Sequence, residues 1–552
     1  MTTIRKYLQI HPSDNVLVAL QDLPAGEVIQ FNGDRFILPA AVAAKHKFSI
    51  EALAPEHEIH MYGVLVGRTN KSIHQGEAIT TENIYHAAND FKLGKRKLDW
   101  HKPDVSNFSD RTFMGYHRSN GTVGTGNYWL VIPLVFCENR NVLVMKEAFE
   151  EKLGFKKAKS YESEVEQLVS LYKTGASIEQ LLSADLLGAK AAHQEHRLFP
   201  NVDGIKFLNH EMGCGGTRMD SDALCGLLAG YITHPNVAGA TILSLGCQHA
   251  QASILRDEIA KRDPNFDKPL YIFEQQKIGS ESVLLQEALK HTFAGLIQAN
   301  QQERKPAGLD KLCIGLECGG SDGFSGISAN PALGYLSDML VTLGGSVILS
   351  EFPELCGVEQ ELSDRCKDEE TALRFMQLMK TYNARAEQDG SGFYANPSPG
   401  NIRDGLITDA IKSAGAAKKG GTSPVQAVVD YPGSANTPGL NLLCTPGNDV
   451  ESTTAEVGAG ANVVLFTTGL GTPTGNPIAP VVKLSTNTKT YEKMPDIIDI
   501  NCGTIIEGRE TIGQAAERIL DFVIEVASGR QIPKAVKLGQ DDFIPWRRGV
   551  SL

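Results

Sequence analysis

Three cysteines of this chain follow apolar runs that we expect to be buried strands. Cys214 comes after FLNHEMG, Cys247 ends TILSLGC and Cys318 ends CIGLEC. In open parallel sheets the functional loops lie beyond the carboxyl ends of the strands, so three such thiols could meet at one edge. Three thiolates suit iron or zinc, or three corners of an iron–sulfur cluster.

The same cysteines also have a purely structural interpretation. Their spacing matches no CxxC motif, and free cysteine is among the most buried residue types. Taken from the residues alone, Cys247 and Cys318 are better explained as small apolar side chains at strand ends.

Two histidines are candidates for proton transfer or metal binding. His210 lies four residues before Cys214 in NHEMGCGG, a spacing that shares one face of a helix, although the glycines favour a loop. His46, in AAKHKFSI, is either a surface residue or a group that projects from the N-terminal segment into the next domain. Imidazole titrates near neutral pH, which suits it to acid–base chemistry.

Glycine-rich loops recur in HRSNGTVGTGN, ECGGSDGFSG and TTGLGTPTG. None has the GxxxxGK[ST] order of a P-loop, and none matches a GxGxxG dinucleotide motif in its required context, so nucleotide binding is not supported. Plain turn formation explains most isolated glycines. Backbone N–H groups in such loops can also bind carboxylate oxygens, and the interspersed Ser, Thr and Asn residues suit a polyhydroxy acid.

The elements that must position these residues alternate along the chain. Short β-rich runs between glycines predict a small β unit over about residues 1–95, followed by a polar linker at 96–110. Apolar runs such as GATILSLGC, KLCIGLEC and ANVVLFTTG then alternate with helical stretches, which predicts mostly parallel, Rossmann-like sheets in an α/β fold. We expect a central α/β catalytic domain at 111–400 and a C-terminal α/β domain at 401–552. The charged, helix-rich stretch from about 139 to 200 is expected to be an external excursion.

Composition restricts the partners of the protein. The 552 residues carry a net charge of −12 without a basic block, which argues against nucleic acid or an anionic membrane as the main partner. No signal-peptide core or bilayer-length apolar run is present in the sequence, so we expect a cytoplasmic protein with reduced thiols. A homodimer is expected from general frequency alone.

The ordered motifs resemble one enzyme family. HRSNGTVGTGN, NHEMGCGG, LSLGC, ECGGSDGFSGISANP, SEFPE, NPSPGN, TPGND and FTTGLGTPTG together resemble the altronate and galactarate dehydratases, from about residue 110 to the end. KHKFSIEAL and HMYGVLVG resemble the SAF (β-clip) domain that begins members of this family. GLECGGSDGFSGISANP, LNLLCTPGND and GTPTG are most similar to the altronate branch.

This resemblance implies a hydro-lyase of hexuronate catabolism that converts D-altronate to 2-dehydro-3-deoxy-D-gluconate and water. It implies Fe²⁺, or sometimes Mn²⁺, as cofactor, and makes Cys214, Cys247 and Cys318 the expected metal ligands; whether they hold one iron or a cluster stays open. Gln248 stands where relatives are expected to have Glu, which leaves an acid role there in doubt. A galactarate or other hydroxy-acid lyase, and a non-catalytic sugar-acid binding protein with metal-stapled loops, are the alternatives.

The reaction assigns roles to further residues. A proton must leave C2 and the hydroxyl must leave C3, with the metal spreading the enediolate charge. We expect His210 and His46 to transfer protons, and Asp322 and Glu351 to orient them or the departing hydroxyl. Arg118 is the expected partner of the substrate carboxylate, with Lys483 and Arg218 as alternatives. The expected substrate-binding residues are Ser321, Ser325, Asn330, Asn396, Ser398, Asn401, Thr467, Thr468 and Thr472.

Overall fold

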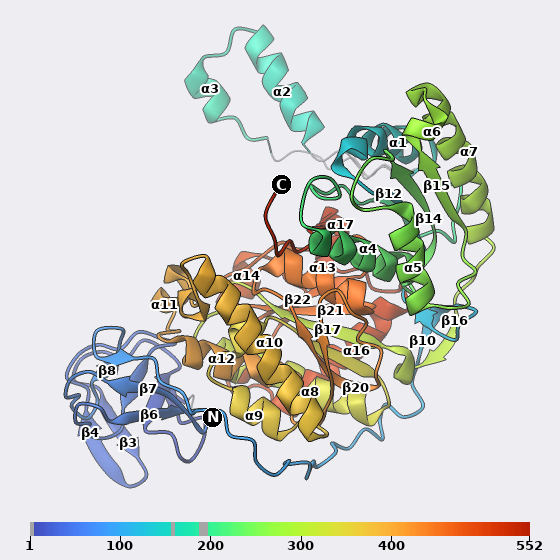
Figure 1. Cartoon of the computed structure of the whole chain (residues 1–552). Helices are drawn as coiled ribbons and strands as arrows, with labels where there is room; N and C mark the ends of the chain where they lie inside the picture. Colours follow the sequence, from blue (N-terminus) through green and yellow to red (C-terminus); the bar gives the residue numbers. More distant parts are fainter. Residues whose placement is uncertain (1–4, 156–160, 187–196) are drawn as a thin grey trace.

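The computed structural model of the chain describes residues 5–155, 161–186 and 197–552 (Figure 1). Its N-terminal part is a β unit of short strands: β1 (Tyr7–Leu8), β2 (Val16–Ala19), β3 (Val28–Phe31), β4 (Asp34–Ile37), β5 (Lys47–Ser49), β6 (Glu58–Met61), β7 (Val64–Thr69), β8 (Ala78–Ile79) and β9 (Ile84–Tyr85). The hairpins β3–β4 and β6–β7 turn at Asn32-Gly33 and Tyr62-Gly63, where all four residues have positive φ. Two-residue turns of this kind match the twist of the paired strands, and they explain the regular glycines seen in the sequence.

A long linker then runs along the C-terminal domain. Residues 86–111 have almost no regular secondary structure, and Figure 1 shows them passing beneath the helices of that domain. The linker is held by hydrogen bonds from the Lys92 N–H to Gln360 Oε1 at 2.7 Å and from the Lys97 N–H to the Asp364 carbonyl at 2.6 Å. It therefore follows the surface of the domain closely.

The middle of the chain forms a four-stranded parallel sheet in the order β13-β12-β14-β15. Its strands are β12 (Tyr128–Pro133), β13 (Gly204–Phe207), β14 (Val237–Ser244) and β15 (Leu270–Glu274), and its main helices are α1 (Asn139–Lys152), α4 (Arg218–Thr233), α5 (Ala252–Arg262), α6 (Gln275–Ile278) and α7 (Glu281–Ala299). A separate three-stranded sheet contains β10 (Thr112–His117), β11 (Val123–Gly124) and β16 (Lys305–Gly308).

The expected excursion at about 139–200 is confirmed only for α2 (Glu162–Lys173) and α3 (Ile178–Leu182), because α1, in the same stretch, packs in the core of the middle sheet through Val142, Met145 and Phe149. Helices α2 and α3 project away from the body of the molecule, at the top of Figure 1, and contain no buried residue. Residues 156–160 and 187–196 of this stretch lie outside the described part of the chain.

A seven-stranded parallel sheet forms the C-terminal domain, in the order β19-β20-β18-β17-β21-β22-β23. Its strands are β17 (Cys313–Cys318), β18 (Ser346–Leu349), β19 (Val425–Asp430), β20 (Gly439–Cys444), β21 (Val463–Thr468), β22 (Val481–Ser485) and β23 (Ile500–Asn501). Its helices are α8 (Ala329–Thr342), α9 (Glu359–Asp364), α10 (Glu369–Gln388), α11 (Pro399–Arg403), α12 (Asp409–Ala417), α13 (Asp449–Ala459), α14 (Thr488–Lys493), α15 (Gly503–Ile506), α16 (Ile512–Ala527) and α17 (Lys534–Leu538).

The structure divides the chain differently from the expected boundary at residue 400. Strands on both sides of that residue pair in one sheet, since β18 pairs with β20, so 401–552 is not a separate domain. Sequence inspection misplaced the boundary because the segment between β18 and β19 holds helices rather than strands. The expected α/β class with mostly parallel sheets is confirmed. No helix in the described ranges is long and apolar enough to cross a membrane.

The two faces of the large sheet enter different cores. Val463 and Leu465 of β21 pack in the core that contains α8, α16 and residues of the N-terminal β unit, whereas Val464 and Phe466 pack with α4, α13 and the middle sheet. This alternation follows from the period of two along a strand. The large sheet is therefore the element against which the other two parts of the chain are positioned.

Tyr62 supplies a test of how the β unit is held. It is 4% exposed, and a Cβ added at Gly326 would lie 2.3 Å from its hydroxyl oxygen, so the side chain fits closely against the C-terminal domain. We predict that Tyr62→Ala, which leaves a cavity worth about 3–5 kcal/mol, loosens this contact and speeds proteolysis within the 86–111 linker. Limited proteolysis checks this, with the exposed Tyr85 as the Tyr85→Ala control. Equal cleavage rates for both variants would contradict the prediction.

Candidate active site

A buried group of acids surrounds the thiol at the end of β17. The Cys318 sulfur lies 3.2 Å from Glu354 Oε2 and 3.4 Å from Glu351 Oε2, and the Cys318 N–H donates to Glu351 Oε2 at 3.1 Å. Glu351 has a left-handed backbone (φ 61°), which turns the chain sharply after β18. Because β17 and β18 are neighbours in a parallel sheet, Cys318 and Glu351 meet at the same edge.

Two lysines neutralise part of this negative charge. Lys419 Nζ donates to Glu351 Oε2 at 2.6 Å, and Lys412 Nζ donates to Glu354 Oε1 at 2.7 Å and to Asn396 Oδ1 at 2.7 Å. Burial opposes the charge of Lys419, but Cys318 and Glu351 outweigh it and raise the pKa of Lys419 well above its usual range. Burial likewise opposes the charge of Glu354, whose pKa is nevertheless lowered because Lys412 and Lys419 lie beside it.

Three more carboxyl groups border the cluster. Burial, and then the nearby Glu351, raises the pKa of Glu317 well above its usual range and that of Asp449 to about 6. Burial raises the pKa of Glu456 to about 8, although the Ser350 hydroxyl donates to its Oε1 at 2.7 Å. Groups in this cluster can therefore hold or exchange a proton near neutral pH.

Asp322 sits at a second junction of the same loops, next to the N-terminal β unit. It is fully buried, accepts hydrogen bonds from Thr486 Oγ1 at 2.9 Å and Ser325 Oγ at 3.2 Å, and lies 3.0 Å from Lys45 Nζ. His46 follows Lys45, with its Nε2 3.1 Å from the Arg403 carbonyl oxygen and its pKa lowered by burial. The β unit thus brings His46 to the C-terminal domain, as one of the two interpretations of this histidine expected.

The predicted hydroxyl and amide residues lie along the loops of the large sheet and bind one another. Most of them form hydrogen bonds within the protein. Asn401 Nδ2 donates to the Ser321 carbonyl, Thr467 Oγ1 to Asn330 Oδ1, Ser398 Oγ to Asn401 Oδ1, and the Gly471 N–H to Thr468 Oγ1, while Thr472 Oγ1 lies 3.0 Å from Thr474 Oγ1. They order the loops around the cluster, and their contact with a substrate stays a prediction.

The glycines of ECGGSDGFSG make room for protein rather than for a ligand. A Cβ at Gly319 would lie 2.2 Å from Asp449 Oδ2, and a Cβ at Gly323 would lie 2.4 Å from the Lys45 carbonyl oxygen. Side chains at these positions would push α13 and the N-terminal β unit away from the cluster. Close approach of other chain segments explains why the loop needs residues that pack so little surface.

His210 does not fit the expected catalytic role. It is buried in the middle domain, with Nε2 2.7 Å from the Pro133 carbonyl oxygen and with Nδ1 accepting the Met212 N–H at 3.1 Å. Burial lowers its pKa to about 4, so the ring is neutral and both nitrogens are used by the backbone. His210 therefore supports the backbone of the middle domain rather than exchanging protons with a substrate.

The three expected metal ligands do not meet. Cys318 belongs to the large sheet, whereas Cys214 and Cys247 are exposed residues in loops of the middle sheet. The three sulfur atoms do not all lie within 4.8 Å of one another. The sequence could not show that similar strand-end motifs belong to two different sheets.

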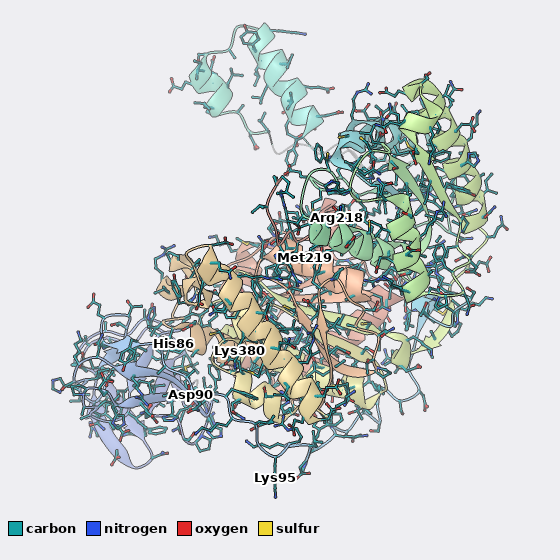
Figure 2. The ribbon with its side chains drawn as sticks, in the orientation of Figure 1. His86, Asp90, Lys95, Arg218, Met219 and Lys380 are labelled. Atoms are coloured by element: carbon teal, nitrogen blue, oxygen red, sulfur yellow. The ribbon has the colours of Figure 1, made fainter. Side chains whose placement is uncertain are left out.

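The proposed cationic partners are also placed elsewhere. Arg118 is buried, donates to the Pro235 carbonyl at 2.7 Å and to Asn127 Oδ1 at 3.1 Å, and also bonds Gln302. Lys483 is buried over the Phe466 ring and donates to the Thr474 carbonyl. Arg218 begins α4 at the position labelled in Figure 2 and is exposed. Lys412 and Lys419, which sequence reasoning missed, are the lysines that meet the cluster.

A second group of possible metal ligands lies where the β unit joins the C-terminal domain. Donor atoms of His86, Cys356 and Asp409 all lie within 4.8 Å of one another, and His86 Nδ1 pairs with Asp409. His86 is partly exposed and is labelled between the two domains in Figure 2. The motif SEFPE, noted from sequence for its likeness to the family, supplies Glu351 and Glu354 to the first group, and Cys356 of the second group lies two residues after it.

The neutral state of His210 gives a pH prediction. Its pKa is about 4 in the folded chain against about 6.5 when unfolded, so the unfolded chain binds the proton first as the pH falls. The stabilisation is complete above pH 6.5 and is lost between pH 6.5 and 4, about 3 kcal/mol in total. Relative to His210→Gln, the wild type should lose unfolding free energy in urea over this window. The exposed His291→Gln variant is the control and should follow the wild type.

The Lys419–Glu351 pair gives a stability prediction. Lys419→Met leaves the Glu351 carboxylate buried without its partner and should lower the unfolding free energy by about 3–5 kcal/mol. Adding Glu351→Gln removes the stranded charge and should restore a large part of this loss. Urea unfolding of both variants checks the expectation, and the half-buried neighbour provides the Lys418→Met control. A double variant as unstable as the single one would show that the pair is not coupled.

Comparison with known proteins agrees with the geometry. Three family models match in order: the altronate/galactarate dehydratase SAF domain at residues 5–87, the D-galactarate dehydratase/altronate hydrolase second domain at 115–300, and the D-galactarate/altronate dehydratase C-terminal domain at 309–551. These matches coincide with the β unit, the middle sheet and the large sheet.

Curated relatives match along almost the whole chain. An altronate dehydratase of Bacillus subtilis is 32% identical over 100% of both chains, and one of Escherichia coli is 31% identical over 95% of this chain and 96% of its own. A galactarate dehydratase (L-threo-forming) of Escherichia coli is 30% identical over 95% of this chain and 93% of its own. The chain therefore belongs to the altronate/galactarate dehydratase family of sugar-acid hydro-lyases.

Proposed function

We propose that the chain dehydrates D-altronate to 2-dehydro-3-deoxy-D-gluconate at the buried cluster around Cys318 and Glu351. The observation that carries this proposal is the gathering of five carboxyl groups, one thiol and two lysines at the carboxyl ends of β17 and β18. Ligands of open α/β sheets bind at this edge. The similarity to two altronate dehydratases over nearly their full lengths supports the substrate.

The donor atoms of the cluster fit a divalent metal. Cys318 offers a soft ligand and Glu351 and Glu354 offer hard ones, within 4.8 Å of one another. Glu351 Oε1 is buried without a hydrogen-bond partner, although Oε2 is bound by Lys419. Fe²⁺ accepts such a mixed set, and Mn²⁺ suits its oxygen members. When bound, the ion would supply Lewis-acid stabilisation of the enediolate.

The side chains of the cluster can carry the proton transfers. A base must take the C2 proton, and the C3 hydroxyl must leave with a proton as water, after which the enol tautomerises to the 2-keto acid. Asp449, with a pKa of about 6, is suited to accept the C2 proton. Lys412 donates to Asn396 Oδ1, and Asn396 is only half-buried. Lys412 is therefore suited to bind the substrate carboxylate. His46 and Asp322 stay candidates for the departing hydroxyl.

The expected surroundings complete the proposal. Ser321 and Ser325 follow β17, Thr467 and Thr468 end β21, and all four are proposed to bind substrate hydroxyls. A cytoplasmic homodimer stays a prediction.

A substrate panel tests the function. Protein purified anaerobically, with Fe²⁺ or Mn²⁺ added, should form a 2-keto acid from D-altronate with a kcat/KM at least about tenfold above that for galactarate, the substrate class of the third relative. Asp449→Asn should lower kcat by about 10²-fold or more, while Glu525→Gln, at an exposed carboxylate, should not. Preference for galactarate would move the assignment to that branch, and binding without turnover would overturn the catalytic proposal.

A further inference from the structure

Three exposed cysteines lie on loops that follow three adjacent strands of the middle sheet. Cys137 follows β12, Cys214 follows β13 and Cys247 follows β14, and these strands are neighbours in the order β13-β12-β14. The other seven cysteines of the chain are buried or half-buried. Parallel strands end at one edge, so the three loops share it.

Backbone hydrogen bonds interlock the three loops. The Phe136 N–H donates to the Met212 carbonyl at 3.0 Å, which joins the loop of Cys137 to that of Cys214. The Ala250 N–H donates to the Gly213 carbonyl at 3.1 Å, which joins the loop of Cys247 to the same place. Gly213 is required here, since it has φ 98° and a Cβ would lie 2.3 Å from the Leu134 carbonyl oxygen. The chain therefore builds a fixed position for each thiol.

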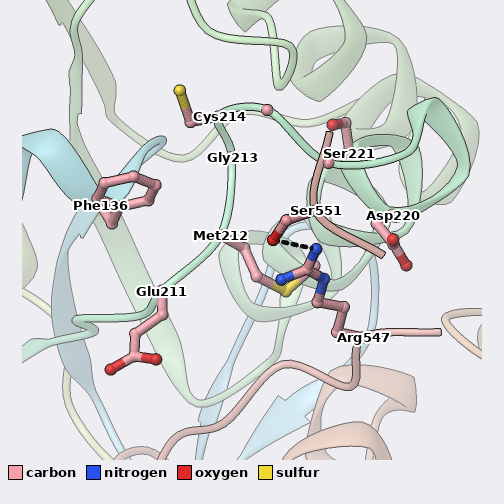
Figure 3. Close-up of a pocket in the computed structure, with 11 residues that line it drawn as sticks. Phe136, Glu211, Met212, Gly213, Cys214, Asp220, Ser221, Arg547 and Ser551 are labelled. Atoms are coloured by element: carbon pink, nitrogen blue, oxygen red, sulfur yellow. Dashed lines mark hydrogen bonds between the residues drawn. The ribbon is translucent and has the colours of Figure 1, made fainter. Parts of the chain in front are cut away.

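One of the three thiols is held by a neighbouring side chain. Gln276 Nε2 donates to the Cys247 sulfur at 3.2 Å, a contact of the kind that orients metal thiolates. Figure 3 shows Cys214 at the rim of a pocket that Phe136 and Arg547 also line, so the thiol faces open space.

The spacing of the sulfur atoms distinguishes between kinds of metal group. Around a single tetrahedral ion with metal–sulfur bonds of about 2.3 Å, thiolate sulfurs lie about 3.8 Å apart. The sulfurs of Cys137, Cys214 and Cys247 do not all lie within 4.8 Å of one another. An iron–sulfur cluster binds each thiolate to a different iron, which requires wider spacing.

We propose that Cys137, Cys214 and Cys247 bind a four-iron iron–sulfur cluster through three thiolates, leaving one iron without a protein thiolate. The sequence led us to expect Cys214, Cys247 and Cys318 as the metal ligands. In the proposed site Cys137 takes the place of Cys318. It is a metal centre additional to the carboxylate-rich group used in the proposed function, and it does not depend on the identity of the substrate. The open iron can take an oxygen ligand from water or from a small hydroxy acid.

Metal analysis of the full-length protein tests the site. The wild type, produced with iron and purified anaerobically, should contain about four sulfide and about five iron per chain, four in the cluster and one at the Cys318 group, and show the visible absorption and, after reduction, the electron paramagnetic resonance of a cluster. Iron without sulfide, zinc in place of iron, or a disulfide among the three cysteines in the anaerobic protein would each overturn the proposal. These readouts do not require a folded variant or an active enzyme.

Variants identify the ligands. Cys137→Ser, Cys214→Ser and Cys247→Ser should each lower the sulfide content at least about tenfold, while Cys318→Ser should keep it. Circular dichroism verifies that each variant is folded. If a variant is unfolded, the iron and sulfide content of the wild type decides whether a cluster is present. A cluster that survives Cys137→Ser but is lost in Cys318→Ser would overturn the assignment. A protein with the cluster but no altronate turnover would refute the substrate proposal alone, and turnover without sulfide would refute the cluster alone.

Discussion

At one end of the large sheet, more acidic than basic side chains are buried together, and this excess constrains the rest of the structure. In the described part of the chain, five carboxyl groups lie against Cys318 or its neighbours, and two lysines pair directly with Glu351 and Glu354. Removing such groups from water costs several kcal/mol each, so they persist only where partners are fixed. The chain meets this requirement by holding Lys412 on α12 and Lys419 in the short helix that follows it. Glu317 and Glu456 form no ion pair with a lysine in the described part of the chain. Their pKa values are raised, which favours the protonated, uncharged carboxyl.

The position of α12 in turn depends on the N-terminal β unit. Thr408 Oγ1, at the start of α12, donates to the Val66 carbonyl at 2.9 Å, and Lys47 Nζ donates to the Gly405 carbonyl at 2.6 Å. The same unit places Lys45 3.0 Å from Asp322. The β unit therefore does more than cover a surface: it fixes the helix that carries one of the two neutralising lysines.

The sequence was sufficient for the fold class and for one end of the site. Alternating apolar runs predicted parallel sheets, Cys318 was noted because it ends an apolar strand-like run, and Asp322 and Glu351 were named for roles that the expected reaction requires. Lys412 and Lys419 could not be found in this way, since they lie in a helix and a Lys- and Gly-rich stretch about 60 residues further on. His210 was misjudged because sequence spacing does not show that both ring nitrogens meet backbone groups.

The error over the third thiol has a general physical cause. Motif likeness grouped Cys214, Cys247 and Cys318 because each ends a similar strand–glycine segment, but loops are brought together by strand order within a sheet. β17 belongs to the large sheet, whereas β12 lies between β13 and β14 in the middle sheet, so the segment after β12, which carries Cys137, lies beside the loops of Cys214 and Cys247. Cys137 lacks flanking glycines in LVFCENR, and it therefore gave no local signal. The order of the strands in the sheet decides which loops lie beside Cys137. These loops carry Cys214 and Cys247, which are 77 and 110 residues further along the chain.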